Sequence, residues 1–153
     1  MRSIAPASGE AGELSTHTVA ILLLALATRL LVLWFAVTQF PHNWVFTRGV
    51  ELGTLAQSLA AGKGLSSPFG GSTGPTALLA PGYPALISIL FRIFGCFTFT
   101  AAVAVMLLQL LFSVATVLLI MTVAQKCFDR WTAELAGVFW AVSLPLLWMP
   151  EIF

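Results

Sequence analysis

Residues 98–124 read TFTAAVAVMLLQLLFSVATVLLIMTVA, and this stretch decides the fold class of the 153-residue chain. The stretch is nearly all apolar, and no charged residue occurs between Arg92 and Lys126. About 20 apolar residues in a helix are enough to cross the roughly 30 Å hydrocarbon core of a bilayer. We therefore predict a transmembrane helix over residues 98–125.

Two further segments are long and apolar enough for the same prediction. One covers residues 18–40 and contains Arg29, and the other covers residues 131–149. We expect Glu134 in the first turn of that last helix, where a carboxylate interacts favourably with the positive end of the helix dipole. The chain is thus predicted to be an all-α, polytopic membrane protein with three transmembrane helices. The predicted divisions are a flexible tail over residues 1–17, a membrane domain over residues 18–153 and an outer loop over residues 41–97.

The composition supports a membrane location. Apolar residues make up 59% of the chain and charged residues 8%, whereas a soluble domain carries about 25% charged residues. The net charge is +1 and there is no basic run, so nucleic acid is not an expected partner. A cleavable signal peptide fits the N-terminal apolar segment poorly, because that segment continues past Arg29 and no small-residue cleavage site follows before Pro41.

The basic residues do not decide the orientation of the predicted helices. Three would lie on the side of the tail and three on the side of the outer loop, so the positive-inside rule favours neither arrangement. The tight turn over residues 126–130 favours a cytoplasmic position for the tail side. The two sets of basic residues are Arg2, Lys126 and Arg130, and Arg48, Lys63 and Arg92.

The cysteines and histidines predict neither a disulfide nor a metal site. Cys96 and Cys127 lie at opposite ends of the central predicted helix, and 31 residues at 1.5 Å each separate them by roughly 45 Å. This separation is far beyond disulfide reach. His17 and His42 are isolated in the sequence, so no zinc-ligand spacing occurs.

The outer loop is predicted to contain two short helices near the membrane surface, over residues 49–61 and 83–94. In the first, Leu52, Leu55 and Leu59 recur at helical spacing, whereas Glu51, Thr54 and Ser58 fall on another face. We expect this helix to lie on the membrane and to end at Gly62. Its polar face should meet a groove closed by Gly74-Pro75-Thr76, and its leucines should point to the bilayer or to the first transmembrane helix.

Several motifs follow one another in a recognisable order along the chain. They are the apolar helix with Arg29, Glu51-x-x-x-x-Ala56-x-x-Leu59-x-x-Gly62-x-Gly64, Gly74-Pro75-Thr76, Pro81-x-Tyr83-Pro84, Phe91-x-x-Phe94-Gly95, and the long apolar helix. This order resembles the N-terminal part of bacterial GT-C-fold glycosyltransferases of the family 39 type. These enzymes are relatives of the protein O-mannosyltransferases and of the enzymes that move aminoarabinose onto lipid A. The resemblance covers about Leu22 to Pro145.

The resemblance implies sugar transfer from a polyprenyl-phosphate donor to an acceptor at the outer face of the bacterial inner membrane. It implies that Glu51 acts as catalytic base or positions the acceptor. The family commonly carries a pair of acidic residues there, and in this chain Val50 precedes Glu51. Family members have about a dozen transmembrane helices, so we expect the chain to be an N-terminal part that is incomplete or inactive alone. No cofactor is predicted, and a divalent metal is left open.

The remaining candidate residues each have two interpretations. Lys63 and Arg92 either attract the donor phosphates or anchor the chain among lipid headgroups. Tyr83 either contacts substrate or anchors at the interface, and Glu51 has an alternative role as a helix N-terminal carboxylate. Arg29 is expected to face the bundle interior in a structural role, without a partner from its own chain.

The alternative function is that of a small structural or accessory membrane protein whose helices pack on other membrane helices. Transport is a third hypothesis, although the sequence shows neither the internal repeat nor the pair of interrupted helices that are typical of transporters.

Overall fold

The computed structural model describes residues 16–39, 50–69, 71 and 73–143, and these residues form five helices. Apart from one isolated bridge between Ser66 and Pro75, they contain no β-structure. The prediction of an all-α chain is therefore confirmed for the described part. The helices are α1 (Thr16–Gln39), α3 (Val50–Ala60), α4 (Gly82–Phe94), α5 (Phe99–Cys127) and α6 (Arg130–Val142).

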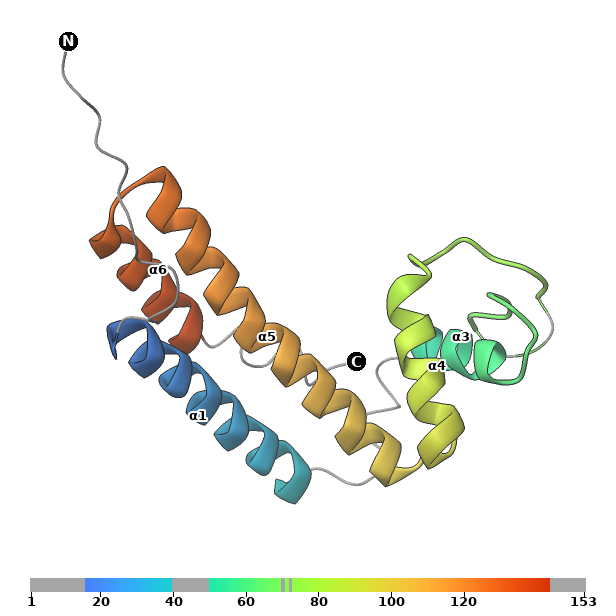
Figure 1. The fold of residues 1–153 in the computed structure, drawn as a ribbon. Helices are drawn as coiled ribbons and strands as arrows, with labels where there is room; N and C mark the ends of the chain where they lie inside the picture. Colours follow the sequence, from blue (N-terminus) through green and yellow to red (C-terminus); the bar gives the residue numbers. More distant parts are fainter. Residues whose placement is uncertain (1–15, 40–49, 70, 72, 144–153) are drawn as a thin grey trace, which may run out of the picture.

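Helices α1, α5 and α6 pack side by side, and we call them the bundle (Figure 1). α1 runs antiparallel to α5, because Ile21 near its start clusters with Met121, whereas Leu33 clusters with Ala102 at the start of α5. Within the described residues, α1 and α5 are long and apolar enough to cross a membrane. The 29 residues of α5 extend about 43 Å at 1.5 Å per residue.

The predicted transmembrane helices agree with the structure in two cases. The segment predicted over residues 18–40 corresponds to α1, and the segment over residues 98–125 corresponds to α5. The third, over residues 131–149, is described only as the 13-residue α6, and residues 144–153 lie outside the described residues. Thr16 and His17 of the predicted tail already belong to α1, and the rest of that tail, residues 1–15, lies outside the described residues.

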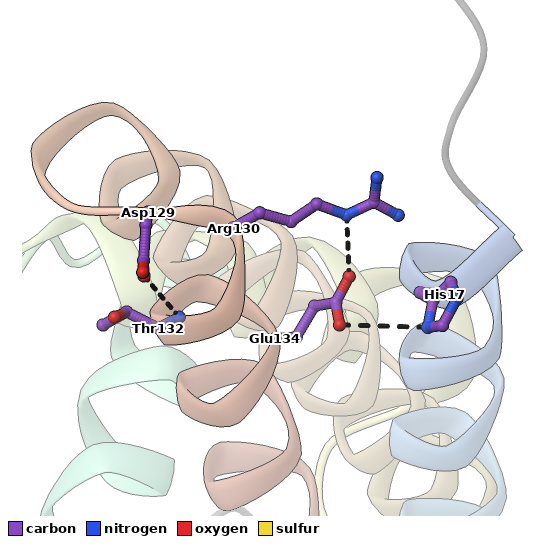
Figure 2. A network of polar contacts seen from close by, with 5 residues as sticks. All are labelled: His17, Asp129, Arg130, Thr132 and Glu134. Carbon is purple, nitrogen blue, oxygen red and sulfur yellow. Dashed lines mark hydrogen bonds and ion pairs between the residues drawn. The ribbon is translucent and has the colours of Figure 1, made fainter.

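The N-cap of α6 is Asp129, and Glu134 does not lie in the first turn as predicted. The side chain of Asp129 accepts a hydrogen bond of 2.8 Å from the backbone N–H of Thr132, which makes it the N-cap (Figure 2). This hydrogen bond holds the pKa of Asp129 below its ordinary value. Glu134 lies beyond the first turn, where one carboxylate oxygen is 2.9 Å from Arg130 Nε and the other is 3.8 Å from His17 Nδ1.

The inner face of α6 is a row of small residues. Ala133, Gly137 and Ala141 are all buried and recur every four residues. Small residues at this spacing let helix backbones approach closely inside a membrane. At Gly137 the approach is so close that an added Cβ would lie 2.6 Å from Met121 Sδ and 3.2 Å from Ile21 Cγ2. The glycine thus allows α6 to sit against both α1 and α5.

Helices α3 and α4 form a second unit at the start of α5, which we call the cap (Figure 1). Ala56 of α3 clusters with Ile87 and Phe91 of α4 and with Val105 of α5, and Leu52 packs against this cluster. Leu55 is also fully buried. The expectation that the α3 leucines point to the bilayer or to the first transmembrane helix is therefore wrong for Leu52, because its side chain packs against α4 and α5.

Gly62 terminates α3, as predicted. Gly62 has φ of 76°, and its N–H donates to the Leu59 carbonyl at 3.0 Å, while the Lys63 N–H donates to the Ser58 carbonyl at 2.9 Å. This pair of hydrogen bonds is a Schellman motif, which glycine accommodates without strain at positive φ. Glycine at position 62 therefore ends α3 and turns the chain into the loop that leads to α4.

Candidate functional site

Glu51 lies in the first turn of α3 and its side chain is exposed. It makes no ion pair with any residue that the structure describes. The positive end of the helix dipole favours a carboxylate at this position. Glu51 is thus an exposed carboxylate on a helix whose opposite face packs against α4 and the start of α5.

The loop after α3 folds back over the polar face of that helix. The Thr54 hydroxyl lies 3.0 Å from the Glu51 carbonyl oxygen and also contacts the carbonyl oxygen of Pro68. Gly74 is held in the same loop, because its carbonyl accepts from the Ser67 N–H at 3.1 Å. The predicted loop therefore does lie against this face, but the residue that meets Thr54 is Pro68 and not one of the Gly74-Pro75-Thr76 segment.

Arg92 lies at the end of α4 and hydrogen-bonds the last turn of α3. Its Nε donates to the Ala60 carbonyl at 3.2 Å and its Nη2 to the Leu59 carbonyl at 3.1 Å. The last carbonyls of a helix have no partner within the helix, and a cation there also complements the negative end of the dipole. Arg92 thus caps α3, whereas the predicted role was contact with substrate or headgroups.

The predicted cationic and acidic residues lie at opposite ends of α3. Lys63 follows the helix and is exposed, close in sequence to the carbonyls that Arg92 caps. Glu51 is nine residues before Ala60, which corresponds to roughly 13 Å along the helix axis. The fold therefore brings Lys63 and Arg92 to one end of α3 and leaves Glu51 at the other.

Tyr83 lies in the first turn of α4 and is half-buried against α5. Its hydroxyl oxygen accepts a hydrogen bond from Nε2 of Gln109, and its ring packs against the cluster around Ile87. Burial raises the pKa of Tyr83, and the hydrogen bond from Gln109 opposes that shift. The ring and hydroxyl of Tyr83 therefore join α4 to α5, which neither of its two predicted roles requires.

Arg29 faces the interior of the bundle in a structural role, as predicted. Its side chain is 3% exposed, and its Nε donates to Ser113 Oγ of α5 at 2.6 Å. Its Nη1 donates to the carbonyls of Ala25 at 3.0 Å and Ala141 at 3.4 Å. The expectation that Arg29 has no partner in its own chain is wrong, because α5 and α6 together surround its guanidinium with oxygen atoms.

Arg29 lies close to two carbonyls in the last turn of α6, those of Trp140 and Ala141. Arg29 Nη2 lies 3.5 Å from the Trp140 carbonyl, and the neighbouring Thr28 hydroxyl lies 3.0 Å from the Ala141 carbonyl and equally close to the Leu24 and Ala25 carbonyls of its own helix. The helix ends there, since Ser143 has extended backbone angles. A helix C-terminus carries partial negative charge, so it compensates part of the buried positive charge. Arg29 and Thr28 therefore cap α6 inside the bundle.

The described residues contain neither a candidate metal site nor a disulfide. No group of three or more His, Cys, Asp or Glu side chains within them could hold a metal ion. Cys96 and Cys127 are both exposed and free. Within the described cap, Glu51 is an exposed carboxylate.

Comparison of the chain with protein-family models, with curated proteins and with solved structures finds no match. The glycosyltransferase resemblance therefore remains a prediction based on the motifs themselves.

Proposed function

We propose that the chain is the N-terminal membrane unit of a glycosyltransferase that moves a sugar from a polyprenyl-phosphate donor to an acceptor. In this proposal the bundle lies in the bacterial inner membrane, and the cap lies at its outer face. The observation that carries the proposal is Glu51, an exposed carboxylate in the first turn of α3. The cap holds it beside the first turns of α5, which is one of two helices long enough to span a membrane.

The proposed chemistry needs a base beside the acceptor hydroxyl. Glu51 removes the hydroxyl proton, the acceptor oxygen forms a bond to the anomeric carbon, and the bond from that carbon to the phosphate oxygen breaks. The polyprenyl phosphate leaves with the electron pair. This transfer requires the carboxylate within about 2.6–3.2 Å of the acceptor oxygen. Exposure of Glu51 allows an acceptor from the aqueous side to reach that distance.

The proposed binding residues contribute unequally. Lys63 is exposed but lies at the opposite end of α3 from Glu51, so in the proposal it attracts the anionic donor to the cap and does not hold the phosphate at the reacting carbon. Arg92 already donates to two carbonyls of α3, and Tyr83 already accepts from Gln109. In the proposal these two residues keep α3 and α4 in place, and any contact with substrate is additional to that role.

A second candidate is a structural or accessory membrane protein without catalytic activity. The engagement of Arg92 and Tyr83 in helix packing favours it, because both residues have a sufficient structural explanation. The partners in this case are lipids and other membrane helices. The two candidates differ in whether Glu51 has any role beyond its interaction with the helix dipole.

The test is sugar transfer by the full-length protein in nanodiscs, with a radiolabelled polyprenyl-phosphate sugar as donor. Glu51→Gln keeps the shape of the side chain and removes the base, so transfer should fall by about 10²-fold or more. Glu134→Gln is the matched control, since that carboxylate lies at the other end of the bundle and pairs with Arg130. If Glu51→Gln keeps wild-type activity, or if the wild type transfers no sugar, the structural candidate is the better description.

A further inference from the structure

The link between α4 and α5 runs from Gly95 to Thr98, and hydrogen bonds fix it at both ends. Gly95 ends α4 with φ of 91°, and the Thr98 hydroxyl donates to the Phe94 carbonyl at 2.9 Å. The same hydroxyl accepts from the Ala101 N–H at 3.2 Å, which caps the start of α5. The link therefore has a defined path, and Phe97 lies within it.

Phe97 adopts a backbone conformation that is unusual for a bulky residue. Its φ is 56°, in the left-handed region where the Cβ of an L-amino acid crowds the following carbonyl oxygen. Glycine adopts this region at little cost. A phenylalanine keeps such a conformation only where surrounding contacts hold it, and residues of this kind gather at functional sites.

The ring of Phe97 lies against α4 and against the backbone of α3. Its centroid is 5.3 Å from that of Phe91 of α4, and the two ring planes are inclined by 55°. An added Cβ at Gly53 of α3 would lie 2.9 Å from Cε1 and 3.6 Å from Cζ of the Phe97 ring. Glycine inside a helix costs stability relative to alanine. The close approach of the ring gives the physical reason for a residue without a side chain at position 53.

The Phe97 ring supports the side of α3 that is opposite Glu51. At 3.6 residues per turn, Gly53 lies about 200° around the helix from Glu51 and about 3 Å along its axis. Gly53 is buried, and Glu51 is exposed. The first turn of α3 therefore carries the carboxylate on one side and rests on the Phe97 ring on the other.

Different contacts hold the two ends of α3. Arg92 binds the carbonyls of Ala60 and Leu59 in the last turn. In the first turn of any helix, the backbone N–H groups have no acceptor within the helix. The orientation of that turn therefore depends more on side-chain packing, and Phe97 supplies such a contact at Gly53.

We propose that Phe97 is a positioning residue for Glu51, and that its ring sets the direction in which the first turn of α3 presents the carboxylate. The inference rests on the proposed function, in which the carboxylate must lie within about 2.6–3.2 Å of the acceptor oxygen. Phe97 lies behind the helix and does not touch the reacting atoms. It acts through the contact of its ring with Gly53.

Sugar transfer by the full-length protein in nanodiscs tests the catalytic consequence. Gly53→Ala adds a Cβ at 2.9 Å from Cε1, whereas ordinary contacts lie at 3.4–4 Å, so the first turn must move by about 0.5–1 Å. A misplacement of 1 Å can cost about 10²-fold in rate. We expect kcat to fall about tenfold with the donor KM unchanged, because the base and not the donor is displaced. Gly82→Ala, whose Cβ meets no atom within 4 Å, should keep the wild-type kcat.

A second substitution separates positioning from a general loss of stability. Leucine lacks the Cε1 and Cζ atoms that the added Cβ would meet, so Phe97→Leu makes room for Gly53→Ala. The double variant should recover kcat to within about threefold of the wild type, although each single variant is slower. Losses that arise from instability alone would instead accumulate in the double variant.

Distances between spin labels test the positioning without any substrate. The two cysteines are exposed and are first changed to serine, and nitroxides are placed at Glu51→Cys and Leu111→Cys, both exposed positions. Phe97→Gly removes the ring and relieves the backbone strain, so the distribution of distances between the labels should widen. Phe94→Ala removes an exposed aromatic ring at the end of α4 and should leave the distribution unchanged.

Each result supports the inference or overturns it. An unchanged distribution in Phe97→Gly overturns it, and so does a double variant no faster than Gly53→Ala. If the distribution widens but Gly53→Ala keeps the wild-type kcat, the ring orients α3 without any effect on the base, and the positioning role is wrong. If the wild type transfers no sugar, or if Glu51→Gln keeps its activity, the proposed function fails and the positioning role fails with it. The distance measurement then still shows whether Phe97 orients α3.

Discussion

Gly137 is the position where the packing of the bundle can be tested most directly. An added Cβ would lie 2.6 Å from Sδ and 2.7 Å from Cγ of Met121, and 3.2 Å from Cγ2 of Ile21. Favourable contacts between such atoms occur at about 3.5–4.0 Å. Met121 and Ile21 are themselves buried, so neither can move away without disturbing its neighbours. Gly137→Ala should therefore separate α6 from α1 and α5.

Two opposing effects determine the size of the change. Extra volume in a well-packed core costs about 1–3 kcal/mol. Alanine in place of glycine inside a helix contributes about 1 kcal/mol of stability. We expect Gly137→Ala to lower the free energy of unfolding by about 0–2 kcal/mol, the difference between these two effects. Because this net value is small, a single substitution is not decisive.

A double-mutant cycle with Met121→Ala isolates the steric effect. Met121→Ala alone should cost about 2–5 kcal/mol through the cavity that it leaves. With the Met121 side chain shortened, Gly137→Ala no longer meets Sδ or Cγ and should stabilise the protein by up to about 1 kcal/mol, less the cost of the remaining 3.2 Å contact with Ile21 Cγ2. The expected coupling between the two positions is therefore about 1–3 kcal/mol, equal to the relieved overpacking.

The free energy of unfolding can be measured in mixed micelles by titration with sodium dodecyl sulfate, with helical circular dichroism as the signal. Gly82→Ala is the matched control, because an added Cβ at Gly82 meets no atom within 4 Å. That variant should be neutral or slightly stabilising. A coupling near zero, or a stabilising Gly137→Ala in the otherwise unchanged protein, would refute the close packing of α6 against Met121.

Three further predictions concern helix ends. Arg29→Met removes the donors to the last carbonyls of α6, and a hydrogen bond to a charged group contributes about 1.5–3 kcal/mol. Backbone amides of residues 139–142 should then exchange with deuterium about tenfold faster or more, and unchanged exchange would exclude Arg29 as the cap. Arg92→Ala should likewise speed deuterium exchange of the backbone amides in the last turn of α3, and Arg92→Lys should restore part of the protection. If both variants exchange at the wild-type rate, Arg92 does not cap α3. The pKa of Asp129 is lowered in the folded state, so its contribution to stability is present above the ordinary value of 3.8 and is lost as pH falls through the folded value. The melting temperature of Asp129→Ala should therefore depend less on pH in the acidic range than that of the wild type, and identical profiles would contradict the N-cap.

The sequence by itself determined the helices that local composition controls. The run without charge over residues 98–124 is α5, and the apolar segment around Arg29 is α1. The short helices of the outer loop were also predicted close to their observed bounds, as was the turn at Gly62. These features depend on residues within a few positions of one another, through hydrophobic length, helical spacing and the freedom of glycine at positive φ.

Only the tertiary structure decided what the polar side chains and helix faces contact. Arg29 binds Ser113 across 84 positions in sequence, and Arg92 binds Leu59 across 33. Whether an arginine in an apolar segment meets a substrate, a headgroup or a helix end depends on which helices pack beside it. The same holds for α3, whose Leu52 packs against α4 and α5. Helical spacing identifies an apolar face, but the partner that covers it is set by the packing of segments distant in the chain.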